Sequence, residues 1–279
     1  MRLSVKRAGR MKLSKLRPSQ IAGLEVWLAV ITLLLILVAC AGPFVAQPDG
    51  HHAFADQRTF LGIPFALDVL SNLPFAIWGL AGLWLAWPVA AGRHEAASDN
   101  RAQGWQALIF CTGLVMTSAC SSWYHLNPSD ASLAVDRCGM VLAFAGLLGL
   151  AAGSRAGKRA GWCMTTLVVV LGPVAVAVWS MTGNVTLWLV LQFGGLLLIV
   201  WLACLAPVRG ALPVRWFLVI FFYALAKCLE MADHQVYEVA GHLVSGHSLK
   251  HLVASFSAWP VISALLQRRV STGRHVTMK

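Results

Sequence analysis

The chain has 279 residues, of which 58% are hydrophobic and only 12% are charged, and its mean hydropathy is +0.70. This composition excludes an ordinary soluble domain and is typical of a polytopic membrane protein. The formal net charge of +11 does not indicate nucleic acid as a partner, because the basic residues fall in alternate loops and so orient membrane helices. We therefore expect an all-α, polytopic membrane helix bundle.

Taken in chain order, eight apolar runs are long enough to span a hydrocarbon core of about 30 Å. A basic N-terminal tail at 1–23 precedes an additional transmembrane helix at 24–46, which is longer than a signal-peptide core. An outer loop at 47–66 leads to a seven-helix core at 67–267, and a second basic tail occupies 268–279. The predicted core helices are 67–91, 104–124, 134–153, 162–181, 184–206, 214–233 and 248–267.

The charges of the loops predict the orientation of the bundle. Basic residues lie in both tails and in the loops after the second, fourth and sixth spans, whereas the loops of the other face contain only Arg58. Basic loops remain on the cytoplasmic side of a membrane. We therefore expect both termini to be cytoplasmic, in a membrane such as the inner (plasma) membrane of a bacterium.

Two pairs of polar residues, each spaced by one helical turn, mark the outer face of the predicted bundle. Ser121 and His125 lie at the end of the span at 104–124, and His247 and His251 lie at the start of the last span. Asp136 begins the next span after His125. Residues four apart lie on one helix face. The topology thus predicts that three imidazoles, one carboxylate and one hydroxyl share one side of the membrane.

Three histidines from two helices form the ligand set of a catalytic zinc site, in which the fourth position is open to water. We therefore predict that His125, His247 and His251 bind Zn²⁺. Asp136 could then accept a proton from the attacking water or orient a ligand histidine, and Ser121 could donate a hydrogen bond to an oxyanion. The set favours hydrolysis of an amide or ester, with the site near the periplasmic or outer face.

Each of these residues also has a structural interpretation. Polar pairs one turn apart occur in ordinary helix packing, and Asp136 could simply pair with the adjacent Arg137. Lys227 and Glu230 are three residues apart and could neutralise each other. The alternative is that Glu230 or Asp233 orients a ligand histidine or contacts the substrate.

Further polar residues fall outside these pairs. Asp68, Ser71 and Asn72 begin the second span and could equally form a helix cap. The remaining histidines of the loops and tail are expected to be solvated; they are His51, His52, His94 and His275.

The pattern Ser121-x3-His125, Asp136 and His247-x3-His251 resembles the signature of the alkaline ceramidases. That family belongs to a superfamily of seven-helix membrane hydrolases that also includes adiponectin-receptor-like proteins. The segments DVLSNLPFAIWGLAGL, SSWYHLNPSDASLAVDRCGM and LEMADHQVYEVAGHLVSGHSLKHL resemble its bacterial members, and the resemblance covers roughly residues 56–267. It implies that the three histidines bind zinc, that Asp136 assists the attacking water and that Ser121 stabilises the oxyanion.

The resemblance also implies a substrate, namely ceramide or a related N-acyl lipid, which would be cleaved at its amide bond to a fatty acid and an amine. Animal members carry an acidic calcium-binding stretch that ends in a Glu shortly before an SNL tripeptide. Here SNL occupies 71–73, and the position six residues before its Ser holds Phe65. Calcium is therefore not predicted.

Other classes of function remain open. A membrane receptor or sensor with a structural zinc site is the main alternative, although it would favour a closed site with four protein ligands. A haem protein would need histidines on facing helices, and a transporter would show matching interrupted half-helices. The sequence does not predict an oligomeric state.

Overall fold

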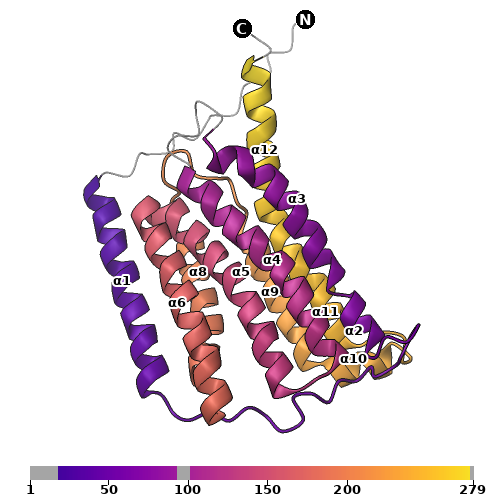
Figure 1. Ribbon diagram of the computed structural model, residues 1–279. Coiled ribbons are helices and arrows are strands. Elements are labelled where there is room, and N and C mark those ends of the chain that lie inside the picture. Colours follow the sequence, from indigo (N-terminus) through magenta and orange to yellow (C-terminus); the bar gives the residue numbers. More distant parts are fainter. Residues whose placement is uncertain (1–17, 93–100, 277–279) are drawn as a thin grey trace, which may run out of the picture.

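The computed structural model describes residues 18–92 and 101–276, and within these residues the chain forms helices and no strand. The predicted all-α membrane helix bundle is confirmed (Figure 1). The helices are α1 (Pro18–Ala41), α2 (Ala66–Leu70), α3 (Leu73–Ala90), α4 (Arg101–Leu126), α5 (Asp130–Ala156), α6 (Lys158–Thr182), α7 (Thr186–Leu189), α8 (Gly195–Ala203), α9 (Trp216–Met231), α10 (Asp233–Val239), α11 (Gly246–Ser255) and α12 (Trp259–Val276). A π-helical turn, Val190–Gly194, joins α7 to α8, and a 3₁₀ turn, Phe256–Ala258, joins α11 to α12.

Seven helical segments in the described part of the chain are long and apolar enough to cross a membrane. They correspond to seven of the eight predicted spans and lie at Ser19–Ala41, Ala66–Ala90, Arg101–Leu126, Asp130–Ala156, Lys158–Thr182, Thr186–Ala203 and Gly246–Val270. The remaining prediction, 214–233, falls on α9, which has 16 residues. At 1.5 Å per residue this helix is about 24 Å long, less than a hydrocarbon core.

The boundaries predicted for the first helix are wrong at both ends. The helix α1 begins at Pro18 instead of residue 24 and ends at Ala41, because Gly42 and Pro43 follow. Residues 1–17 of the predicted tail lie outside the described residues. At the other end of the chain, α12 continues to Val276, so much of the predicted tail at 268–279 is helical. Only 6% of the apolar window of α1 is buried, and the helix lies at one side of the bundle (Figure 1).

The centre of the bundle depends on close contact between α4 and α5. A Cβ atom added at Gly113 would overlap the backbone of Ala143, and one added at Gly146 would overlap the backbone of Phe110. Small residues at such positions let helices approach each other in a membrane, where packing is a main attraction between them. This contact fixes the relative positions of the two helices that carry Ser121, His125 and Asp136.

A long connection, here called loop 42–65, joins α1 to α2 along the end of the bundle where α10 lies (Figure 1). It is attached to that end at several points. The backbone N–H of Val45 donates to the side chain of Asn184, and the N–H of Ala55 donates to Asp233. Arg58 donates to the carbonyl oxygen of Leu243. The loop therefore covers the ends of the helices that carry the candidate site.

Candidate metal centre

The turn between α4 and α5 brings two of the predicted elements together. Asn127 and Pro128 end α4, and Ser129 caps α5 by accepting a hydrogen bond from the backbone N–H of Ser132 while Ser132 bonds back to the backbone of Ser129. This reciprocal capping box satisfies N–H groups that would otherwise have no partner. As a result His125, on the last turn of α4, lies close to the first turns of α5.

The start of α11 is fixed in a similar way. Ser245 caps the helix by accepting from the backbone N–H of Ser248, and the backbone N–H of His247 donates to Asp233 at 2.7 Å. The other carboxylate oxygen of Asp233 accepts from Ala55 of loop 42–65. Asp233 therefore orients a predicted ligand through its backbone N–H and not through its imidazole, while the predicted contact with substrate stays a prediction.

The structure brings the three predicted ligand histidines together in one buried cluster. His125, His247 and His251 each offer a nitrogen, and these nitrogens lie within 4.8 Å of one another. The ring centres are 4.9 Å apart for His125 and His247, 5.0 Å for His125 and His251, and 4.9 Å for His247 and His251. Ligand nitrogens at about 2.1 Å from one tetrahedral ion would be about 3.4 Å apart. A small inward shift of the rings would therefore allow one ion to bind.

The polar atoms of the cluster fit a metal ion. Nδ1 of His125 and Nε2 of His247 are buried and have no hydrogen-bond partner among the residues that the structure describes. Buried polar atoms nearly always have a hydrogen-bond partner. A neutral imidazole nitrogen without one is free to coordinate a metal ion. Three imidazoles without a thiolate suit zinc and other borderline transition metals, so the chain contains a buried three-histidine group that could hold a metal ion.

The third histidine is oriented by residues of the turn between α2 and α3. Nδ1 of His251 lies 2.9 Å from the hydroxyl of Ser71 and 3.5 Å from the side-chain nitrogen of Asn72, which leaves Nε2 to face the cluster. The same two side chains also donate to the backbone carbonyl of Asp68, while the carboxylate of Asp68 accepts from Ser248 at 2.6 Å. Ser71 and Asn72 therefore position a predicted ligand and make no side-chain helix cap.

Ser121 and Asp136 lie together beside this cluster. Both are buried, their side chains interact with each other, and Ser121 is one turn before His125 on α4. One carboxylate oxygen of Asp136 is buried without a partner. The suggested ion pair between Asp136 and Arg137 is not formed, because no ion pair among the described residues includes either side chain.

Loop 42–65 contributes an aromatic cover that the sequence did not predict. The ring of Phe54 is buried, and its centre lies 4.7 Å from that of His125 and 4.4 Å from that of His247. Beside it, the hydroxyl of Tyr124 lies 2.8 Å from Nδ1 of His52, whose other nitrogen contacts Asp130. His52 is therefore part of this cover, although it was predicted to be solvated. His51 is exposed as predicted, and His94 lies outside the described residues.

A group of three charged side chains connects α9 to α11. The two carboxylate oxygens of Glu230 each accept a hydrogen bond from a lysine, Oε2 from Nζ of Lys227 at 2.5 Å and Oε1 from Nζ of Lys250 at 2.6 Å. The predicted pair of Lys227 and Glu230 is present, and the structure adds Lys250, which lies between the two histidines of α11 in the sequence. Glu230 therefore neutralises charge in the bundle and does not contact a ligand imidazole within hydrogen-bond distance in the described chain.

The sequence matches no protein-family model, and a search of curated proteins finds no match. The class of protein is therefore defined by the fold and the site alone. The chain is an integral membrane protein of all-α architecture with a buried three-histidine group that could hold a metal ion.

Proposed function

We propose that the protein is a zinc-dependent membrane amidohydrolase that cleaves the amide bond of ceramide or a related N-acyl lipid to a free fatty acid and an amine. The observation that carries the proposal is a set of unpartnered buried atoms, which are Nδ1 of His125, Nε2 of His247 and Oδ1 of Asp136. Two of them suit a metal ion and the third suits a water molecule or substrate beside it. Buried polar atoms without a partner are rare, and a bound ion, water molecule or substrate would account for these three.

Zinc held by His125, His247 and His251 would polarise the scissile carbonyl and activate water. Asp136 would take a proton at its unpartnered oxygen and pass it to the departing nitrogen, as a general base and then a general acid. The hydroxyl of Ser121 would donate a hydrogen bond to the oxygen of the carbonyl as negative charge develops there. Phe54 would exclude bulk water, which strengthens these electrostatic interactions.

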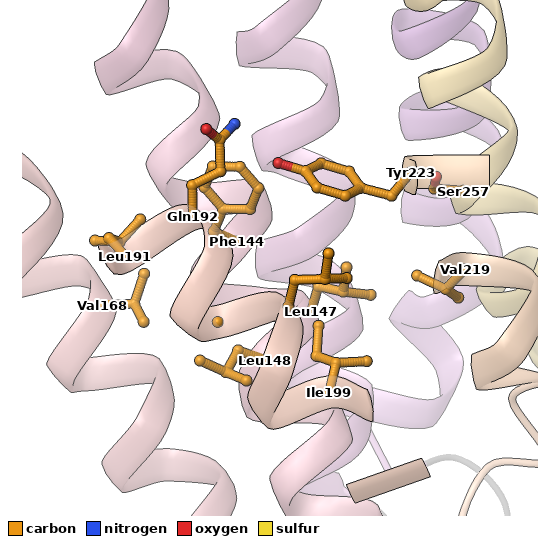
Figure 2. Close-up of a pocket in the computed structure, with 12 residues that line it drawn as sticks. Phe144, Leu147, Leu148, Val168, Leu191, Gln192, Ile199, Val219, Tyr223 and Ser257 are labelled. Atoms are coloured by element: carbon orange, nitrogen blue, oxygen red, sulfur yellow. The ribbon is translucent and has the colours of Figure 1, made fainter. Parts of the chain in front are cut away.

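An apolar cavity supports a lipid as the substrate. The cavity lies between α5, α8 and α9, and its lining is almost entirely apolar, as is typical of sites that take an apolar ligand. Figure 2 shows Leu147, Leu148 and Ile199 along its apolar part, with the polar ends of Gln192 and Tyr223 pointing toward each other. An acyl chain in this cavity would suit the apolar walls. Ser257, which also lines it, is six residues beyond His251.

The proposal extends to the cellular location. Seven candidate membrane spans together with basic residues in alternate loops favour an integral membrane protein with the histidine cluster toward the non-cytoplasmic face. The resemblance to bacterial ceramidase-like proteins favours the inner membrane of a bacterium. A lipid substrate would then reach the site from within the membrane, between helices.

The test is the metal content of the full chain, purified in detergent without added metal and measured by elemental mass spectrometry. Wild type is expected to contain close to one zinc per chain, and His251→Ala is expected to lose it. His242→Ala is the matched control, because the ring of His242 is exposed and lies beside Glu238 and Tyr237, outside the cluster. The zinc-loaded protein should release fatty acid from N-acyl lipids, and His251→Ala should not.

Well-folded wild type without zinc would contradict the proposal. Zinc without hydrolysis of any N-acyl lipid would contradict the enzyme and favour a receptor or sensor with a structural metal. Hydrolysis that persists in His251→Ala would show that the reaction occurs elsewhere.

A further inference from the structure

Arg137 is a buried cation next to the candidate site that the proposed reaction does not use. It follows Asp136 in the second turn of α5, and only 5% of its surface is exposed. An isolated charge removed from water is costly unless it is paired. The surroundings of this guanidinium therefore need an explanation.

The contacts of Arg137 are aromatic and neutral. Its Cζ lies 3.9 Å from the ring centre of Trp179 at the end of α6 and 5.5 Å from that of Trp188 in α7. Nη2 donates to the side-chain oxygen of Gln47 at 2.9 Å. Nη1 is buried without a partner, and no carboxylate in the described chain lies within 4.0 Å. The guanidinium is thus held in a fixed plane with a donor group unused.

A second arginine of the same helix shows that this arrangement is specific to one end of the bundle. Arg155 is 18 residues further along, five helical turns, and is 9% exposed. Its Nε donates to the carbonyl oxygen of Leu202, and none of its nitrogens is buried without a partner. The position of Arg155 at the predicted cytoplasmic end also follows from the orientation rule. Among the described residues, Arg137 has neither a backbone carbonyl partner of this kind nor a position at the predicted cytoplasmic end, so these two reasons do not explain it.

The aromatic contacts of Arg137 connect it to the apolar cavity. Trp188 lies 6.1 Å from Phe144, measured between ring centres, and Phe144 lines the cavity beside Tyr223 (Figure 2). On the other side, the neighbouring residue Asp136 belongs to the candidate site. Arg137 is therefore connected to the wall of the cavity through Trp188 and Phe144, and to the candidate site through Asp136.

We propose that Arg137, stacked on Trp179 and supported by Gln47, binds the anionic group of an acyl lipid head, either a carboxylate or a phosphate. The proposal deepens the proposed function, since it names the substrate class as N-acyl lipids with an anionic head. The cleavage of such a lipid rests on the proposed amidohydrolase activity, whereas its binding by Arg137 does not. A guanidinium offers two parallel N–H groups to a carboxylate or phosphate, and stacking on an aromatic ring fixes its plane. Nη1 of Arg137, which has no partner in the described chain, would donate to the anionic group.

The first measurement is equilibrium dialysis of the full chain, treated with a chelator so that no amide is cleaved, against N-lauroylglycine and N-lauroylethanolamine. These probes have equal acyl chains, and only the first carries a negative charge. Wild type is expected to bind N-lauroylglycine about 10- to 100-fold more tightly, the range for a hydrogen-bonded charge. Arg137→Gln should bind both probes equally, and Arg155→Gln, the matched control, should keep the preference.

Other variants and probes identify the source of the anion. Arg137→Lys keeps the charge and replaces Arg137→Gln as the test if that variant does not fold. Its preference for N-lauroylglycine is expected to be about tenfold smaller than that of wild type, because lysine cannot make the bidentate contact. Inorganic phosphate and free laurate should not displace N-lauroylglycine at equal concentration. Displacement by inorganic phosphate alone would overturn the lipid assignment in favour of a free-anion site, and displacement by laurate would overturn the head-group assignment in favour of product binding.

The zinc-loaded protein supplies a readout that a structural role would not change. Arg137→Gln is expected to raise KM for N-lauroylglycine and to leave kcat and the kinetics of N-lauroylethanolamine unchanged. An equal loss of kcat for both probes would overturn the proposal and assign Arg137 to the support of Asp136. If the chain hydrolyses neither probe but Arg137 determines the binding preference, the amidohydrolase fails while the anion site stands. A preference that survives in Arg137→Gln would overturn the anion site alone.

Discussion

At the scale of single residues, the candidate site consists of ligand side chains and the neighbours that orient them. His251 has a partner at Nδ1, whereas Nδ1 of His125 and Nε2 of His247 have none. The difference suggests that Ser71 selects the nitrogen of His251 that faces the cluster. Such partners of a ligand fix the orientation of the ring and raise its affinity for a metal.

Ser71→Ala is therefore expected to weaken zinc binding by about 10- to 100-fold without removing a ligand. Competition with a chromophoric chelator would measure the affinity. Ser263→Ala is a suitable control, because the hydroxyl of Ser263 donates only within α12 to Pro260. Unchanged affinity in Ser71→Ala would mean that Asn72 or packing alone orients the imidazole.

The two predicted catalytic residues should separate binding from turnover. Asp136→Asn is expected to retain zinc and lose most turnover, because the amide cannot accept the proton. Ser121→Ala should lower kcat by about 10²–10³, the usual cost of one oxyanion donor. Zinc content and kcat measured on the same preparations would check both. Full turnover in Asp136→Asn would remove this residue from the mechanism.

At the scale of elements, the site depends on how closely α4 and α5 approach each other. Gly113→Ala would place a methyl group against the backbone of Ala143, which cannot move as a flexible side chain would. Overpacking of this kind costs about 1–3 kcal/mol.

We expect Gly113→Ala to lower the midpoint of heat denaturation in detergent and, through displacement of His125, the zinc content. Gly195→Ala should have little effect, because no described atom beyond the nearby backbone of its own helix lies within 4 Å of the added Cβ position. Equal denaturation midpoints in the two variants would show that the α4 and α5 contact relaxes.

Loop 42–65 is expected to respond to pH through Asp56. Burial of this carboxyl opposes its ionisation, but hydrogen bonds from the backbone and side chain of Arg58 outweigh that effect and hold the pKa of Asp56 below its ordinary value. The stabilisation is therefore present above the pKa of the unfolded carboxyl and is lost as the pH falls through the folded pKa, below about pH 4. The same arginine contacts Leu243, so acid should loosen the loop.

Hydrogen exchange of loop 42–65 as a function of pH, corrected for intrinsic exchange, would measure this effect. Wild type should gain exchange in acid, whereas Asp56→Asn should show the loosened loop already at neutral pH and little further change. Asp49→Asn serves as the control, because Asp49 is exposed. A wild-type loop that stays protected at pH 3 would show that its other attachments suffice.

At the scale of the whole molecule, the start of α1 and the end of α12 lie at the same end of the bundle (Figure 1). The basic residues of the two predicted tails agree with this arrangement. Such an arrangement requires the short helix α9 to complete the path across the membrane, although its 16 residues are fewer than a full span needs. Hydrophobic mismatch of this size can be met by local thinning of the bilayer.

Fusions of a reporter that is fluorescent only in the cytoplasm are expected to be bright at both termini. A fusion within loop 42–65 is expected to be dark, because that loop belongs to the opposite face. A dark C-terminal fusion beside a bright N-terminal one would show that α9 does not cross, and the orientation of the histidine cluster would then have to be reassigned.

The class of the protein and the grouping of the histidines are predictable from the amino-acid sequence. Composition predicts a membrane bundle because lipid requires apolar, self-bonded helices, and the four-residue spacing of His247 and His251 is a local property of one helix. The alternation of basic loops then predicts that His125 reaches the same end of the bundle. Each of these inferences needs only neighbours in the sequence or a count of spans.

The distant side chains that complete the site are identified by the fold and not by the sequence. Phe54 lies on the histidine rings, Ser71 faces His251, and Arg137 stacks on Trp179. These contacts join residues from about 40 to 190 positions apart, and no local periodicity encodes them. They arise because a loop crosses the end of the bundle and because close-packed helices bring particular faces together, which depends on the packing of the whole chain.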